Sequence, residues 1–112
     1  MDTRIETQEE AVVQIVEIPV GRGKALGIHV QMPGEGANLL VVRGDHGFIM
    51  CGYLNMALAE EVGDAAAMVR GVNSIEDVLE RTIVSVTSRA RMLGVMPGMP
   101  ARDALAKFMS DQ

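Results

Sequence analysis

The chain has 112 residues, which fits one domain with one hydrophobic core that needs no disulfide or metal to hold it together. Hydrophobic residues make up 48% and charged residues 22%, and these ordinary globular values exclude a disordered chain. Ten basic and fifteen acidic side chains give a formal net charge of −5, which disfavours nucleic acid and anionic membranes as partners because both require a basic face.

The chain begins with a polar and acidic segment, residues 1–10, which predicts a flexible leader rather than a signal peptide. No apolar run approaches the ~18–20 residues that span a bilayer. Residues 11–18 are β-branched and nearly all apolar, and residues 24–32 alternate with a period of two, so both predict strands. The Pro- and Gly-rich residues 19–23 between them predict a turn. His29 falls on the more polar face of the second strand, where we expect it to face solvent.

A hairpin is predicted from residues 39–42 and 48–51, two short apolar segments joined by a turn rich in Gly and Asp. The apolar period then changes from two to 3.6, which predicts a helix over residues 54–62 with Asn55 as its N-cap and a glycine after its end. Residues 65–69 are apolar and predict a fifth, buried strand.

The last third of the chain predicts two or three short helices. Ser74 begins a capping box, residues 85–93 have an amphipathic helical pattern, and Pro100 suits the first position of a final helix. Strands followed by helices predict an α+β fold. We expect a single compact domain over residues 11–112, with a largely antiparallel sheet of about five strands and helices packed on one side.

The residue types that thiol chemistry uses meet in one short segment around Cys51. Cys51 would be the nucleophile, His46 the base that takes its proton, and Asp45 the carboxylate that orients the base. Cys51 also lies just before a predicted helix, whose dipole favours a thiolate. However, His46 is five residues away, roughly 16 Å along an extended strand, so it reaches Cys51 only from a neighbouring subunit or through a sharp bend. His29 on an adjacent strand is an alternative base.

These residues also have ordinary structural interpretations. A single cysteine between Met and Gly is typical of a small buried hydrophobic residue, while Asp45 and His46 fit an exposed turn. One cysteine and two separated histidines predict no closed metal site within one chain. A metal or iron–sulfur cluster that subunits share through Cys51 remains an alternative. The glycine-rich phosphate-binding motifs are absent from the sequence. Candidates for contacting an anion near the sheet edge are Asn38, Arg43 and Arg70.

Residues 45–55 read Asp-His-Gly-Phe-Ile-Met-Cys-Gly-Tyr-Leu-Asn, and this stretch resembles the hallmark of the family catalogued as domain of unknown function 1805. Residues 69–79, and residues 93–99 leading into 102–105, resemble the same family. The resemblance covers about residues 11–109, with one departure at Pro100-Ala101, where relatives often carry Ser-Gly. It implies a compact α+β fold and no established reaction. The positions to which it directs attention are Gly47, Cys51, Gly52, Arg70 and Gly71.

We therefore expect a cytoplasmic protein that works as a homo-oligomer, most simply a dimer, and binds a small molecule or a protein partner around Cys51 and Gly52. The expected ligand-binding residues are Gly47, Gly52, Asn55, Arg70 and Gly71. One alternative is a thiol-dependent enzyme or a sulfur or redox carrier, with Cys51 and His46 as catalytic residues. Another is a metal or iron–sulfur site that Cys51 forms between subunits. The sequence does not identify a cofactor.

Overall fold

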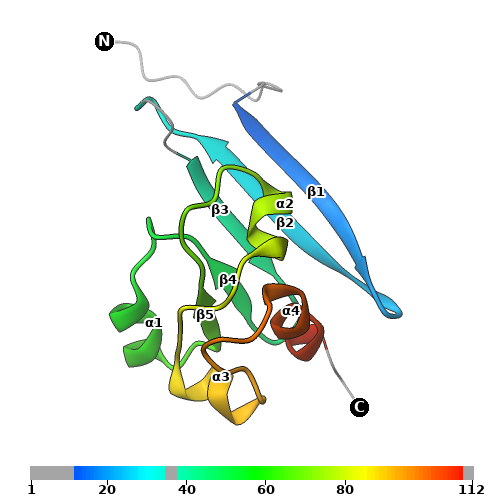
Figure 1. Cartoon of the computed structure of the whole chain (residues 1–112), viewed down its shortest axis with the longest axis vertical. Helices are drawn as coiled ribbons and strands as arrows, with labels where there is room; N and C mark the ends of the chain where they lie inside the picture. Colours follow the sequence, from blue (N-terminus) through cyan, green and yellow to red (C-terminus); the bar gives the residue numbers. More distant parts are fainter. Residues whose placement is uncertain (1–11, 35–37, 110–112) are drawn as a thin grey trace.

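Six strands and four helices make up the part of the chain that the computed structural model describes, residues 12–34 and 38–109 (Figure 1). The strands are β1 (Val13–Val20), β2 (Gly23–Gln31), β3 (Asn38–Arg43), β4 (Phe48–Met50), β5 (Ala66–Met68) and β6 (Ser85–Val86). The helices are α1 (Met56–Val62), α2 (Ile75–Glu80), α3 (Ser88–Met92) and α4 (Ala101–Met109). The leader predicted for residues 1–10 lies outside the described residues. None of the described helices is long and apolar enough to cross a membrane.

The strands form one sheet in the order of the chain, β1-β2-β3-β4-β5-β6. Every neighbouring pair is antiparallel except β4 and β5, which run parallel in the register Phe48↔Ala66 and Met50↔Met68. A parallel pair needs a crossover of about a dozen residues or more, and residues 51–65, which include α1, provide it. The carboxyl ends of β4 and β5 therefore lie side by side at one edge of the sheet.

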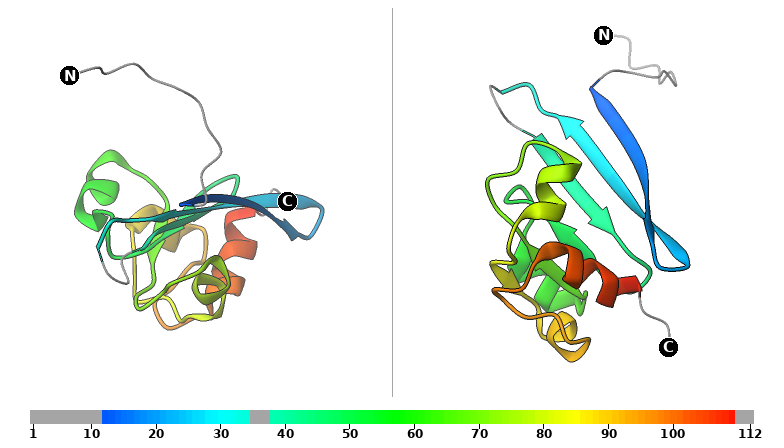
Figure 2. Two further views of the ribbon diagram at one scale, coloured as in Figure 1. Left: turned by 90° about the horizontal axis from the view of Figure 1, so that it is seen from above. Right: turned by 45° about the vertical axis from the view of Figure 1, so that its right-hand side comes forward.

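The main core lies between the sheet and three helices, α2, α3 and α4, which Figure 2 shows on the same side of the strands. Leu40, Val42 and Ile49 point from the sheet into this layer. They pack with Val78 of α2 and with Phe108 of α4, the largest fully buried side chain among the described residues. Burying this apolar layer is the main favourable term in folding.

The two faces of β2 differ in the size of their side chains. Ala25 and Gly27 face the helices and are buried, whereas Leu26 and Ile28 lie on the other face and are half-buried. Small residues suit the helix side because α2 approaches closely, and a Cβ atom added to Gly27 would lie 3.0 Å from Ile75. The middle of β2, from Ala25 to Ile28, is thus apolar on both faces of the sheet.

The opposite face of the sheet is covered by α1 at one end. Met50 of β4 and Met68 of β5 point to this side and pack with Ala59 of α1 in a second, smaller core. This helix lies against β5, and the same face of β1, β2 and β3 carries no described element (Figure 2).

The predicted fold class is confirmed, a single α+β domain with a largely antiparallel sheet. Two details differ from the expectation. There are six strands rather than about five, because Ser85 and Val86 pair with Met68 and Ala67 instead of beginning a helix. In addition, α1 packs on the face opposite the other three helices.

Candidate functional site

A hollow of about 440 Å³ opens at the edge of the sheet where the parallel strands end. Its walls come from three segments that are far apart in the sequence. The β4–α1 turn provides Cys51, Gly52 and Tyr53, the β5–α2 loop provides Gly71, Val72 and Asn73, and the start of β3 provides Asn38. In open sheets with parallel strands, ligands bind beyond the carboxyl ends of those strands. This hollow, which we call the carboxyl-end pocket, occupies that position.

Cys51 forms part of the pocket wall directly after β4. Its side chain is only 3% exposed, and its Sγ atom accepts a hydrogen bond from the Leu40 N–H at 3.3 Å. The thiol is 3.8 Å from the Asn38 carbonyl oxygen, to which it donates. Both contacts are to the backbone of β3, so the sheet holds the thiol in one orientation. Cys51 is part of the main core as well as of the pocket wall.

A line of hydrogen bonds runs from β2 along the pocket wall to the start of α2. His29 Nε2 lies 2.6 Å from Asn38 Oδ1, and because a carbonyl oxygen only accepts, the ring nitrogen donates. Asn38 Nδ2 donates to Asn73 Oδ1 at 3.4 Å, and the Asn73 N–H donates to Asp77 Oδ2 at 2.9 Å. The expectation that His29 faces solvent was wrong, because its ring lies half-buried on the helix side of β2 beside Asn38.

A second hollow of about 340 Å³ adjoins the first and shares Gly52 and Gly71 with it. Arg70 and Met68 complete its lining. The loop between the two hollows is held by Arg81, whose guanidinium donates to the Arg70 carbonyl oxygen at 3.3 Å and to the Gly71 carbonyl oxygen at 2.7 Å. Gly71 itself has a φ of +69°, a conformation that L side chains rarely adopt. The Arg70-Gly71 backbone is therefore fixed in place.

Gly52 has neither of the usual structural reasons to be glycine. Its φ is not among the positive values of the described glycines, and a Cβ atom added to it would meet no heavy atom within 4 Å. Gly52 lines both hollows, so the space that its missing side chain leaves belongs to the pocket. We expect this position to matter for what enters the pocket rather than for folding.

The structure brings together four of the predicted site residues, Cys51, Gly52, Arg70 and Gly71, at the two adjoining hollows. This proximity depends on the parallel pairing of β4 with β5, which no local pattern reveals. Asn55 lies outside the lining of both hollows and caps α1, accepting from the Leu58 N–H at 3.0 Å.

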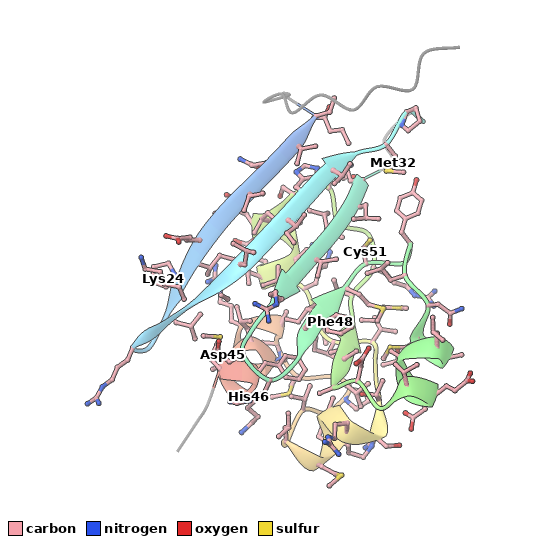
Figure 3. The ribbon with its side chains drawn as sticks, turned by 180° about the vertical axis from the view of Figure 1, so that it is seen from behind. Lys24, Met32, Asp45, His46, Phe48 and Cys51 are labelled. Carbon is pink, nitrogen blue, oxygen red and sulfur yellow. The ribbon has the colours of Figure 1, made fainter. Side chains whose placement is uncertain are left out.

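His46 and Gly47 lie at the other end of β4, away from Cys51 (Figure 3). They line a separate hollow of about 200 Å³ together with Asp45. Gly47 is there for packing, because a Cβ atom on it would collide with the Phe108 ring. Within one chain the predicted catalytic pair of Cys51 and His46 is not assembled.

Tyr53 and Asn73 are pocket residues that the sequence did not single out as candidates. Tyr53 directly follows Gly52, and Asn73 lies two residues after Gly71, but neither carries a chemical pattern of its own. Asn38 was considered only as an anion contact, and its place in the line of hydrogen bonds depends on β3 lying beside β2. Among the described residues, no group of three His, Cys, Asp or Glu side chains is placed to hold a metal ion.

Together, the fold and the pocket define a small α+β domain whose pocket lies beyond the carboxyl ends of a parallel strand pair. The chain belongs to the family described as "Domain of unknown function (DUF1805)", whose profile matches residues 50–108. The matched residues include β5 and the loops that follow β4 and β5, and these loops form most of the pocket.

Two individual proteins are similar to this chain. YunC of Bacillus subtilis (strain 168), described as an uncharacterized protein, is 42% identical over 76 residues, which are 64% of this chain and 75% of YunC. The crystal structure of TA1206 from Thermoplasma acidophilum, described as a protein of unknown function, superimposes with a TM-score of 0.81 at 31% identity. The similarity covers 91% of this chain and 99% of TA1206, so almost the whole fold is shared.

Proposed function

We propose that the protein is a ligand-binding module that holds a small polar molecule in the carboxyl-end pocket, above Cys51 and Gly52. The observation that carries the proposal is Gly52, a residue with no packing or conformational requirement that leaves space in both hollows. A volume of about 440 Å³ falls within the range of roughly 300–1,000 Å³ that is usual for small-molecule sites.

The pocket chemistry favours a molecule that both donates and accepts hydrogen bonds. The Tyr53 hydroxyl both donates and accepts, and the Asn73 side-chain amide offers N–H donors while its carbonyl oxygen accepts from Asn38. Arg70 in the adjoining hollow adds a positive charge. A small carboxylic acid or amide matches these groups, because its oxygens accept from the Asn73 amide and the Tyr53 hydroxyl. A carboxylate also brings a negative charge that meets the guanidinium.

The experiment that tests this proposal is ligand-observed NMR with a set of small carboxylic acids and amides. We expect at least one compound to bind the native protein and to lose at least about 1.4 kcal/mol of binding free energy, tenfold in Kd, in Gly52→Val. The matched control is Ala57→Val on the exposed side of α1, which places a valine outside the pocket and should leave Kd unchanged. A compound that binds Gly52→Val as tightly as the native protein would show that it lies elsewhere.

Thiol chemistry at Cys51 is the second candidate, because the thiol lines the pocket. It ranks lower since Sγ is buried and bonded to the β3 backbone, and since His46 lies at the other end of β4. A metal or iron–sulfur site between subunits ranks third, because a bridging thiolate must reach the surface and Cys51 is 3% exposed. For any of these roles we propose a cytoplasmic location, which suits a chain whose one cysteine has no disulfide partner within it.

A further inference from the structure

The face of the sheet that α1 leaves uncovered is apolar across three strands. Two rows of paired residues cross it from β1 through β2 to β3, and no described element covers them. The rows are Val13–Val30–Leu39 and Ile15–Ile28–Val41, and we call these six side chains the open face. Ile15 at its margin is 66% exposed and Val13 is 45% exposed.

The size of the open face is that of an interaction surface. β1, β2 and β3 have eight, nine and six residues, and at ~3.3 Å per residue and ~4.8 Å between strands they cover roughly 360 Å² of sheet, with the open face at its centre. Side chains standing on a sheet expose more surface than this flat area, and a stable dimer buries about 800 Å² per partner. Exposed Leu58 and Val62 on α1 add apolar surface beside the sheet. Apolar patches above a few hundred Å² on a protein usually mark an interaction site.

A third row carries charges in a self-complementary arrangement. In this row Glu17 of β1 pairs with Leu26 of β2, which pairs with Arg43 of β3. The carboxylate and the guanidinium thus stand on the same face, one strand to either side of β2. Within one chain Glu17 also pairs with Lys24 of β2, whose Nζ lies 3.3 Å from its Oε1, and both side chains are exposed. A two-fold axis running along β2 exchanges the positions above β1 and β3. It places Glu17 of each copy opposite Arg43 of the other, with the apolar rows between the two sheets.

The position of α1 fits the same axis. α1 stands on this face over β5, beyond β4, so it rises next to the open face without covering it (Figure 2). When the sheet of the second copy lies over β1–β3 of the first in reversed order, its β1 lies above β3 of the first copy. The second sheet therefore ends beside α1 of the first copy. Isologous contacts of this kind are the commonest in homo-oligomers because one surface serves both partners.

From these observations we infer that the open face is the interface of a homodimer, with a second copy of this chain packed sheet to sheet about a two-fold axis along β2. A basic partner fits less well, because two of the three charged side chains beside the apolar rows, Lys24 and Arg43, are themselves basic. A membrane fits less well, because Glu17 stands on the same face and the chain carries a net charge of −5. This inference is independent of the proposed ligand, since the carboxyl-end pocket lies at the edge of the sheet.

Sedimentation equilibrium of the full chain tests the inference. The expected mass is about twice the 12.0 kDa of one chain. Ile15→Glu places a carboxylate in the apolar interface and should weaken dimerisation at least tenfold, while circular dichroism stays native because Ile15 is exposed in one chain. The control is Met92→Glu on α3, 77% exposed on the other side of the molecule, which should leave the mass unchanged.

A charge exchange gives a second, independent readout. Glu17→Arg alone and Arg43→Glu alone should each weaken the dimer, because each places like charges opposite one another across the axis. The double variant restores opposite charges and should recover the dimer mass. A native chain that sediments as a monomer at tens of micromolar would overturn the inference. So would a dimer that Ile15→Glu leaves unchanged, or single charge variants that the double variant does not rescue.

Discussion

Gly47 and Gly52 are both glycines of the family hallmark, yet their surroundings are opposite. A Cβ atom on Gly47 would collide with the Phe108 ring and lie 2.7 Å from the Ala65 carbonyl oxygen. The ring is fully buried, so it cannot move toward solvent to make room for the added Cβ atom. A Cβ atom on Gly52 would meet no heavy atom within 4 Å.

We therefore expect Gly47→Ala to lower the free energy of unfolding by about 1–3 kcal/mol, the usual cost of overpacking a core. Gly52→Ala should change it by less than about 0.5 kcal/mol, as for a surface substitution. Urea denaturation of both variants beside the native chain measures the difference. Equal losses for the two would mean that Gly52 also has a structural role.

At the scale of single residues, local signals in the sequence were enough to find the caps. Asn55 accepts from the Leu58 N–H and Ser74 accepts from the Asp77 N–H, as predicted, because a cap depends only on residues three positions along the chain. The pocket is different. Cys51-Gly52 lies beside Arg70-Gly71 only because β4 and β5 pair in parallel. This pairing joins segments that are distant in the sequence, and the local pattern of neither segment predicts it.

Among the secondary-structure elements, α3 depends on a contact from α1 at its start. The Ser88 N–H, near the N-terminus of α3, donates to the Glu60 carboxylate at 2.8 Å. This hydrogen bond holds the pKa of the Glu60 carboxyl below its ordinary value. Because the pKa is lower in the folded state than in the unfolded state, the bond adds stability above the unfolded pKa of about 4.3. That contribution is lost as the pH falls through the folded pKa.

Glu60→Gln should therefore reduce the stability difference between pH 7 and pH 3 relative to the native chain. The amide oxygen of Gln still accepts from Ser88, but it carries no proton equilibrium. Thermal unfolding at both pH values measures the change, with Glu61→Gln as the control because the neighbouring carboxylate is exposed and makes no hydrogen bond to Ser88. A pH dependence identical to that of the native chain would contradict this account.

The elements that the sequence predicted poorly are those whose identity depends on a neighbour. Ser85 and Val86 belong to an amphipathic pattern, yet they pair with Met68 and Ala67 as β6. Thr87 fixes this path, because its hydroxyl donates to the Asp64 carbonyl oxygen at 2.7 Å and accepts from the Ala66 N–H at 3.0 Å. The side chain of Thr87 also caps α3. The buried Thr87 hydroxyl therefore makes α3 begin at Ser88, three residues later than the helical pattern predicts. Helical periodicity alone does not reveal this difference.

At the scale of the whole molecule, the period-two alternation of β2 made the strand itself easy to predict. The alternation did not show which face the helices cover. The small residues Ala25 and Gly27 face the helices, and the larger Leu26 and Ile28 face outward. In an ordinary sheet with one wet face the outward positions are polar. Large aliphatic side chains on the uncovered side are therefore the whole-molecule feature that most needs a partner.

The edge strand β1 gives the final prediction, because its stability within one chain should be low. It pairs only with β2, and all its residues are exposed or half-buried, whereas those of β5 are buried. Local opening of such a strand costs less than global unfolding.

In the native chain at dimer-forming concentration we expect the β1 amides that bond to β2 to exchange slowly. In Ile15→Glu they should exchange at least about tenfold faster, while the β5 amides keep their protection, since about 1.4 kcal/mol of lost interface energy gives that factor. Hydrogen exchange followed by NMR at two protein concentrations separates the strands. If β1 exchanged as slowly in Ile15→Glu as in the native chain, its protection would come from the chain's own packing, and the open face would not need a second copy to cover it.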